Sequence, residues 1–285
     1  MTAVLTVIGD LVEDIVVWTT APSRRGTDNP ATITRSRGGS AANVAAKAAA
    51  KTPTRFVGRV GHDPAGVWLV TALDAVGVDV RVQRGGRTGS VVVVVDPGDG
   101  ERTMYPDRAA AAELAPIEHE WLTGTTVLHV PAYGFATDPA AGSILGAIEY
   151  VRRRGARLSI DVSAVTLIEE FGRDGFSELL DRLAPEVVLA NAEEATALGL
   201  LDHPPSPGCV VVVKDGPRPA VVMLDDGSRH EVAAVAVTEV RDTTGAGDAF
   251  AAGFLATWIR DADPITACAA GHLVAATVLT SVGSG

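Results

Sequence analysis

Short apolar runs recur along the chain at intervals that leave room for a helix between most of them. Runs of this length with few polar residues are typical of strands that a sheet buries on both faces. The strands predicted in this way are Ala3–Ile8, Arg55–Val60, Val127–Pro131, Arg157–Ile160, Val187–Ala190 and Val210–Val213.

Between and after these runs, apolar positions follow the period of a helix. The predicted helices are Ser40–Lys51, Pro64–Val76, Pro139–Arg154, Phe176–Leu183, Ala192–Leu198, Gly245–Arg260 and Pro264–Ser281. Because strands and helices alternate, the pattern predicts an α/β fold with a mostly parallel sheet that helices cover.

Two segments, Leu11–Arg37 and Asp79–Tyr105, depart from this alternation because they carry alternating or β-branched runs without helices. The turn signals Gly85–Gly86 and Pro97–Gly100 divide the second segment into hairpins. We therefore expect residues 11–37 and 79–105 to form a small sheet outside the main body of a single domain spanning residues 1–285.

The composition narrows the class of protein. The formal net charge of −11 disfavours nucleic-acid binding through a basic face, and 47% hydrophobic residues exclude a disordered chain. The two cysteines, Cys209 and Cys268, are too isolated for a disulfide framework. No basic residue precedes Arg24 and no apolar run approaches the ~18 residues of a membrane span. We expect a cytoplasmic protein without nucleic-acid or membrane partners.

Common phosphate-binding and hydrolase motifs are missing: GxxxxGK[ST], GxGxxG and GxSxG do not occur. The informative segment is Gly245-Ala246-Gly247, which stands directly before a helical run. Small residues in a first helical turn leave backbone N–H groups open to an anion. Asp248 follows at once, either as a reactive carboxylate or as an ordinary first-turn acid that the helix dipole stabilises.

The segment DTTGAGDAFAAGF, residues 242–254, resembles the signature of ribokinase-like (PfkB-type) carbohydrate and nucleoside kinases. Further segments resemble that family's motifs in the same order: Gly9–Asp14, Gly38–Asn43, Gly58–Gly66 and Asn191–Glu194. The resemblance covers essentially the whole chain. It implies a doubly wound α/β domain with a β-sheet lid, and transfer of the γ-phosphate of ATP to a hydroxymethyl group of a sugar or nucleoside.

The resemblance also implies roles for individual residues. Asp248 would take the proton of the attacking hydroxyl, and the amides of Gly245, Ala246 and Gly247 would stabilise the transferring phosphoryl group. Phosphoryl transfer depends mainly on such positioning and electrostatic stabilisation. The residues expected to hold the substrate are Asp14, Gly38, Gly39, Asn43, Tyr133 and Asp248.

On the nucleotide side, the resemblance points to Asn191 and Glu194 near Mg²⁺, through water because Mg²⁺ keeps several waters. Lys214 and Gly216 would lie near the ATP phosphates, and His272 near adenine. Asp242 and Thr244 resemble positions for a monovalent cation, which suggests K⁺ as an activator. Each also has a plain structural interpretation: helix-start acids, a strand-end lysine and a core histidine.

The substrate stays open, because the loop that gives true ribokinases a sugar-binding glutamate has Ala132 and Tyr133 instead. Ser163 likewise replaces the usual asparagine near Asp161. We expect a neutral substrate with vicinal hydroxyls, a free pentose or a nucleoside. A sugar phosphate would need cationic residues near the lid, and the candidates are Arg35, Arg37, Arg87 and Arg102. A non-catalytic binding protein is a third alternative. An apolar lid sheet further predicts a homodimer.

Overall fold

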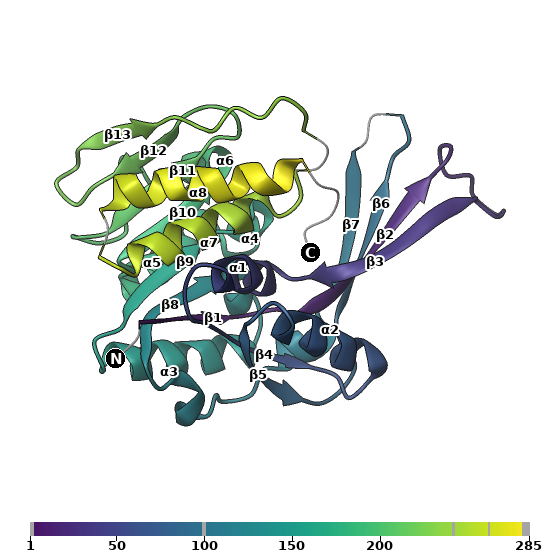
Figure 1. Ribbon diagram of the computed structural model, residues 1–285, viewed down its shortest axis with the longest axis horizontal. Helices are drawn as coiled ribbons and strands as arrows, with labels where there is room; N and C mark the ends of the chain where they lie inside the picture. The colour runs from purple at the N-terminus through teal and green to yellow at the C-terminus, as the bar shows by residue number, and fades with distance from the viewer. Residues whose placement is uncertain (1–2, 99–100, 241–242, 262, 281–285) are drawn as a thin grey trace.

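The computed structural model describes residues 3–98, 101–240, 243–261 and 263–280. It contains one large sheet between two layers of helices and a second, smaller sheet that projects to one side (Figure 1). This is the predicted fold class, a doubly wound α/β domain with a separate lid sheet.

The large sheet has nine strands in the order β13-β12-β11-β10-β9-β8-β1-β4-β5. Its parallel strands are β1 (Val4–Ile8), β4 (Thr54–Val60), β5 (Asp79–Arg84), β8 (Thr125–Pro131), β9 (Arg157–Asp161), β10 (Val187–Asn191) and β11 (Val210–Lys214). Two antiparallel strands, β12 (Ala220–Met223) and β13 (Arg229–Val232), close one edge; the sequence analysis did not predict them.

Helices cover both faces of this sheet. One layer holds α1 (Ser40–Ala49), α2 (Pro64–Asp74), α7 (Ala246–Trp258) and α8 (Pro264–Leu279). The other holds α3 (Ala140–Arg152), α4 (Val165–Phe171), α5 (Arg173–Leu183) and α6 (Ala192–Leu198). Short 3₁₀ helices connect the elements: η1 (Ala109–Glu113), η2 (His119–Leu122) and η3 (Ala132–Phe135).

The strands are apolar throughout because each one serves two cores. In β10, Val188 and Ala190 face the core under α3 and α5, whereas Val187 and Leu189 face the core under α1 and α7. All four side chains are fully buried. Burial on both faces explains why these strands are continuous apolar runs and not alternating patterns.

The lid is a four-stranded sheet in the order β3-β2-β6-β7. Its strands are β2 (Val12–Thr19), β3 (Ala31–Gly38), β6 (Ser90–Val95) and β7 (Arg102–Asp107). The prediction that the second lid segment begins at residue 79 is wrong, because β5 at the start of that segment pairs in parallel with β4 in the large sheet. The helix α2 between β4 and β5 is the crossover that parallel pairing requires.

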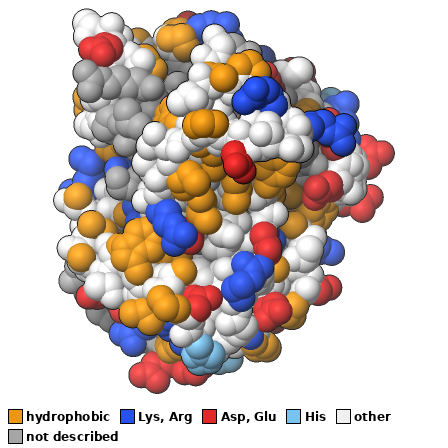
Figure 2. Space-filling model, turned by 90° about the vertical axis from the view of Figure 1, so that its right-hand side faces the viewer, with side chains coloured by type: hydrophobic (Ala, Val, Ile, Leu, Met, Phe, Trp, Pro, Cys, Tyr) orange, Lys and Arg blue, Asp and Glu red, His pale blue; other side chains and the backbone are white. Residues whose placement is uncertain are grey.

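The outer side of the molecule near the lid carries apolar side chains among basic and acidic ones (Figure 2). On the lid strands, Ile33 is 61% exposed, Met104 54% and Tyr105 60%. In the described part of the chain, no helix is long and apolar enough to cross a membrane. Cys209 and Cys268 are both free and buried, as their isolation in the sequence indicated.

Candidate active site

The di-glycine segment joins the lid to the large sheet at the point where β3 ends and α1 begins. A Cβ on Gly38 would lie 2.0 Å from Oδ1 of Asp14, which is on β2. Gly39 has φ +96°, and a Cβ there would lie 2.3 Å from the carbonyl oxygen of Asp10. Only glycine fits this close approach and backbone conformation. The Asp14 carboxylate therefore lies directly beside the backbone of Gly38, two residues before the start of α1.

Three side chains meet beside this segment. Arg37 Nη1 donates to Asn43 Oδ1 at 3.0 Å, and both residues are buried. Burial raises the pKa of Asp14 to about 6, although the charge of Arg37 lowers it; Asp248 raises it further. Carboxylate, amide and guanidinium groups thus converge where the sequence analysis expected the substrate.

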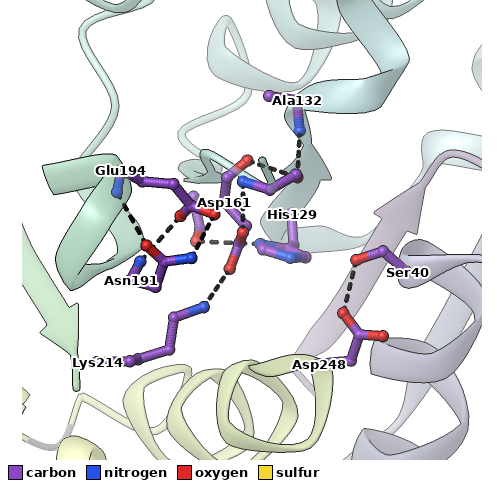
Figure 3. Close-up of polar contacts among 10 residues, drawn as sticks. Ser40, His129, Ala132, Asp161, Asn191, Glu194, Lys214 and Asp248 are labelled. Carbon is purple, nitrogen blue, oxygen red and sulfur yellow. Dashed lines mark hydrogen bonds and ion pairs between the residues drawn. The ribbon is translucent and has the colours of Figure 1, made fainter. Parts of the chain in front are cut away.

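Asp248 is held from α1. Ser40 Oγ donates to its Oδ1 at 2.7 Å, and Asn43 Nδ2 donates to its Oδ2 at 3.0 Å. Figure 3 shows Ser40 and Asp248 pointing toward one another. Burial raises the pKa of Asp248 to about 6 against these two hydrogen bonds, which lower it. The carboxylate is fixed in place and stays mostly ionised at neutral pH.

The turn before Asp248 opens α7. Gly245 is the N-cap in the left-handed conformation, at φ 74°, and Gly247 is exposed. The first amides of a helix have no partner within it. Ala246 N donates to the Thr243 carbonyl at 3.2 Å and so helps to close the turn. Of the three amides expected to bind the phosphoryl group, those of Gly245 and Gly247 are the stronger candidates.

Asn191 and Glu194 form a capping box at the start of α6. Glu194 N donates to Asn191 Oδ1, while Asn191 N and Nδ2 donate to the two oxygens of Glu194, all at 2.8 Å. Glu194 is 3% exposed, and burial followed by the charge of Asp161 raises its pKa to about 7. The pair has the helix-start role that the sequence allowed, and it also lies at the carboxyl end of the large sheet.

Lys214 ends β11 and reaches across to β9. Its Nζ lies 2.8 Å from Asp161 Oδ2, and its side chain is 15% exposed (Figure 3). Burial disfavours the ammonium, but the charge and hydrogen bond of Asp161 outweigh that effect and raise the pKa of Lys214. The lysine is therefore a buried ion-pair partner at the site and does not extend into solvent. Gly216, in a left-handed turn at φ 56°, follows it.

Tyr133 stands in η3, just after β8. Burial raises its pKa to about 12, and the nearby carboxylates of Glu194, Asp161, Asp248 and Asp10 add to the shift. Its side chain is 37% exposed. Tyr133 therefore lies within electrostatic reach of these four carboxylates, and its contact with the substrate stays a prediction.

His272 is less open to a ligand than the expectation implied. It is 7% exposed, its Nε2 lies 3.2 Å from the Val232 carbonyl oxygen, and its ring stands edge-on to Phe250. These are the contacts of a satisfied core histidine. Its place beside adenine stays a prediction.

The cation sites stay predictions. Asp242 lies outside the described residues, and Thr244 Oγ1 accepts a hydrogen bond from Arg102 of the lid. Within the described ranges, no group of three or more His, Cys, Asp and Glu side chains is arranged to hold a metal. The charges of Asp161, Glu194 and Asp248 nevertheless all raise the pKa of the Lys214 ammonium, and Asp161 contacts it directly. This excess of acids fits a water-mediated Mg²⁺ better than direct ligation.

Two residues of this site were not singled out from the sequence. Ser40 follows the di-glycine and resembled an ordinary helix start, yet it holds Asp248. Asp161 was noted only as the neighbour of a departure from the family pattern, yet it pairs with Lys214. A polar residue directly after a buried strand was the available signal for Asp161.

Comparison with known proteins assigns the class. Residues 3–285 match the pfkB family of carbohydrate kinases, and the chain belongs to that family. A relative from Halopiger xanaduensis, named ATP-dependent ribose-1-phosphate kinase, is 34% identical over 242 residues, covering 80% of this chain and 75% of its own. The protein is thus a kinase of the carbohydrate and nucleoside type.

Solved structures agree in fold over the whole chain. An adenosine kinase from Sinorhizobium meliloti superposes with a TM-score of 0.85 at 25% identity, covering 99% of this chain and 95% of its own. A putative ribokinase II from E. coli, in complex with ATP and Mg²⁺, gives a TM-score of 0.85 at 21% identity and covers 100% and 94%. The second likeness concerns the fold alone.

Proposed function

We propose that the protein transfers the γ-phosphate of ATP to a hydroxymethyl group of a sugar or nucleoside, with Asp248 as the general base. The observation that carries this proposal is the setting of Asp248. It is fixed by Ser40 and Asn43 and stands directly after a helix-start turn in which the amides of Gly245 and Gly247 are the candidates to bind an anion. A proton acceptor and an anion site are thus adjacent, as attack of an alcohol on a phosphoryl group requires.

In the proposed reaction one bond to phosphorus forms as another breaks, and Asp248 takes the proton that is released. The acceptor hydroxyl gives its proton to Asp248 as its oxygen bonds to the γ-phosphorus, and the bond from that phosphorus to the bridging oxygen of ADP breaks. A base with a pKa of about 6 is mostly ionised at neutral pH and can take that proton.

Asp14 and Asn43 are suited to hold the acceptor. Two carboxylate oxygens can accept from two adjacent hydroxyls, and the amide of Asn43 already orients Asp248. Tyr133 offers an aromatic face at the same site, on which a nucleobase can stack. A neutral pentose or a nucleoside fits these groups.

ATP is placed in this proposal along Asn191, Lys214 and Gly216, where strands β10 and β11 end. Open α/β sheets bind ligands at the carboxyl ends of their strands. Asn191 and Glu194 would hold Mg²⁺ at this end of the sheet, and the ion would supply positive charge that neutralises the phosphates. We also propose, from the family resemblance, that K⁺ stimulates the reaction and that His272 contacts adenine.

The test is ADP formation across a panel of pentoses, hexoses, nucleosides and sugar phosphates, with the phosphorylated product identified by mass. We expect turnover of at least one neutral acceptor. Binding of a panel compound without any ADP formation would favour the non-catalytic alternative instead.

A sugar phosphate is a second candidate, and Arg37 is the reason. Its buried guanidinium lies with Asn43 and within electrostatic reach of Asp14 and Asp248. The relative from Halopiger xanaduensis is named for a sugar phosphate. By contrast, the side chains of Arg35 and Arg87 are 67% and 59% exposed. Arg37 is therefore the arginine best placed to meet an anionic acceptor.

Arg37→Met separates the two candidates. For a sugar phosphate, the KM of the acceptor should rise by about 10-fold or more, because a charged hydrogen bond contributes about 1.5–3 kcal/mol. For a neutral acceptor, Arg35→Met should leave KM within a small factor, and Arg37→Met should raise KM less than it does for a sugar phosphate, because only the support of Asn43 and Asp14 is lost. Turnover confined to sugar phosphates would reject the neutral substrate.

We also propose that the lid pairs with a second copy of the chain, since Ile33, Met104 and Tyr105 expose apolar surface on it. Sedimentation at micromolar concentration should show a dimer. A strict monomer would contradict the pairing, although the lid itself would remain.

A further inference from the structure

Lys214 lies between the two halves of the site. Its Nζ is 2.8 Å from Asp161, and a Cβ placed on Gly247 would lie 3.6 Å from that same Nζ. The ammonium therefore borders the space above the first turn of α7. The exposed Gly247 and the ammonium therefore border a common volume, and Asp248 is the next residue in the chain.

The charges around Lys214 support a role beyond holding two strands together. Asp161 on β9, Glu194 on α6 and Asp248 on α7 all act on its charge. In return, Lys214 lowers the pKa of both Glu194 and Asp248. His129 on β8 is fully buried within electrostatic reach of Asp161 and Lys214, and burial lowers the pKa of its imidazole to about 4. It therefore adds no positive charge at neutral pH. Lys214 is the cation shared by the proton acceptor and the nucleotide side.

We propose that Lys214 is a catalytic cation that contacts the phosphoryl group during transfer, and that Asp161 is the positioning residue that holds its ammonium ready. The inference rests on the proposed kinase function and deepens it. As the acceptor oxygen bonds to phosphorus and the bond to ADP breaks, negative charge lies on the phosphoryl oxygens above Gly247. Lys214 keeps its protons throughout and donates hydrogen bonds to those oxygens.

The ion pair with Asp161 explains how a buried lysine can serve this purpose. An unpaired buried ammonium is unfavourable, and Asp161 removes that penalty before ATP arrives. When the phosphoryl group enters, the ammonium exchanges one anionic partner for another across the short distance to Gly247. Asp161 itself is anchored, because its Oδ1 accepts from Ser163 N at 2.8 Å.

The experiment compares Lys214→Ala, Lys214→Arg and Asp161→Asn in single-turnover assays, with the Kd of MgATP measured separately by titration. Arg218→Met is the matched control, since Arg218 forms an exposed pair with Asp215 in the same loop. The double variant Asp161→Asn/Lys214→Met removes both charges at once, so a fold lost through one unpaired charge is recovered there.

We expect Lys214→Ala to slow transfer by about 10²–10³-fold while the Kd of MgATP changes much less, because a preorganised charge acts mainly on the transition state. Asp161→Asn should slow transfer by a smaller factor with the same split. Added methylammonium should restore part of the Lys214→Ala rate, whereas tetramethylammonium, which has no N–H donor, should not. Arg218→Met should match the wild type.

The proposal is overturned if Lys214→Ala transfers phosphate at the wild-type rate, or if its only defect is a weaker Kd for MgATP. It is also overturned if the well-folded double variant keeps the wild-type rate. Failure of the proposed function looks different: the wild type itself would form no ADP with any acceptor, or Asp248→Asn would remain fully active.

Discussion

The acceptor half and the nucleotide half of the site are built in different ways. In the acceptor half, Ser40 and Asn43 on α1 both donate hydrogen bonds to Asp248 on α7, from positions 208 and 205 residues away in the chain. In the nucleotide half, Asn191 and Glu194 bond to each other within one helical turn, and Lys214 bonds to Asp161. The first half has the proton acceptor in place, whereas the second holds its polar groups in internal pairs.

This difference indicates a division of work. A base must sit within hydrogen-bond reach of its proton before reaction, and the packing of α1 against α7 fixes it there. The phosphates of ATP bring charge of their own, so the residues that meet them need stable partners until the nucleotide arrives. The following predictions test whether the two halves respond separately.

Removal of Mg²⁺ should have the largest effect, and it should act through the nucleotide half. Asp161, Glu194 and Asp248 leave negative charge that one lysine does not balance. Excess chelator should reduce turnover by about 10³-fold or more, because a metal supplies several kcal/mol of charge stabilisation. Chelator saturated with Mg²⁺ is the control. Full activity in excess chelator would contradict the role of Mg²⁺.

Glu194→Gln should raise the Mg²⁺ concentration needed for half-maximal activity by about 10–100-fold, the range for lost outer-sphere partners. Glu193→Gln is the matched control, since Glu193 is the exposed neighbour in the same turn. The KM of the acceptor should be unchanged in both. Equal Mg²⁺ dependence in the two variants would indicate that Glu194 only caps α6.

Ser40→Ala should affect the acceptor half alone. The hydrogen bond from Ser40 lowers the pKa of Asp248, so its loss should raise that pKa above its value of about 6. Activity falls as pH drops through that pKa, and the acid limb of kcat/KM should therefore move to higher pH. At neutral pH, we expect a loss of about threefold to tenfold. An acid limb at the wild-type pH would contradict the role of Ser40 in lowering the pKa of Asp248.

The wild-type acid limb carries a further expectation. Asp14 and Asp248 both have a pKa of about 6, and the charge of Asp248 contributes to the raised pKa of Asp14, so both carboxylates should titrate within the acid limb. The Ser40→Ala profile should be compared with that of Ser206→Ala, a serine in a distant loop. Only the first should shift.

Replacement of Na⁺ by K⁺ should have the smallest effect. Thr244 already accepts a hydrogen bond from Arg102, so one of the two residues expected at the cation site has a cationic partner from the lid. We expect a stimulation smaller than any change above. Equal initial rates in the two salts at matched ionic strength would contradict activation by K⁺.

The sequence was most informative where function depends on local pattern. Apolar runs predicted the central strands because both faces of those strands are buried. The glycine motifs pointed to Gly38 and Gly39, where nearby atoms leave no room for a side chain, and to Gly245, where the backbone is left-handed. The sequence was less informative for β5, which was grouped with the lid although it pairs with β4. The pairing of β5 with β4 depends on the crossover through α2, and the composition of the strand does not reveal which strand it will pair with.

Contacts between distant segments were also hard to predict. Ser40 and Asp248 are 208 positions apart, and Lys214 and Asp161 are 53 apart. Nothing in a single sequence relates such pairs, because packing of the helices and strand order bring them together. The contact of His272 with the Val232 carbonyl is another pair of this kind, 40 positions apart, and the family resemblance that places His272 near adenine gave no sign of it.

The most direct test of the central claim is the single-turnover rate of Asp248→Asn, measured with the melting temperature on the same preparation. The substitution keeps size and hydrogen bonding but removes the proton acceptor. We predict a rate about 10²–10⁴-fold lower, with the Kd of MgATP and the melting temperature little changed. Asp263→Asn, at the N-cap of α8, is the control for a helix-start acid and should leave the rate intact. A folded Asp248→Asn variant with near-normal turnover would contradict the assignment of Asp248 as the base.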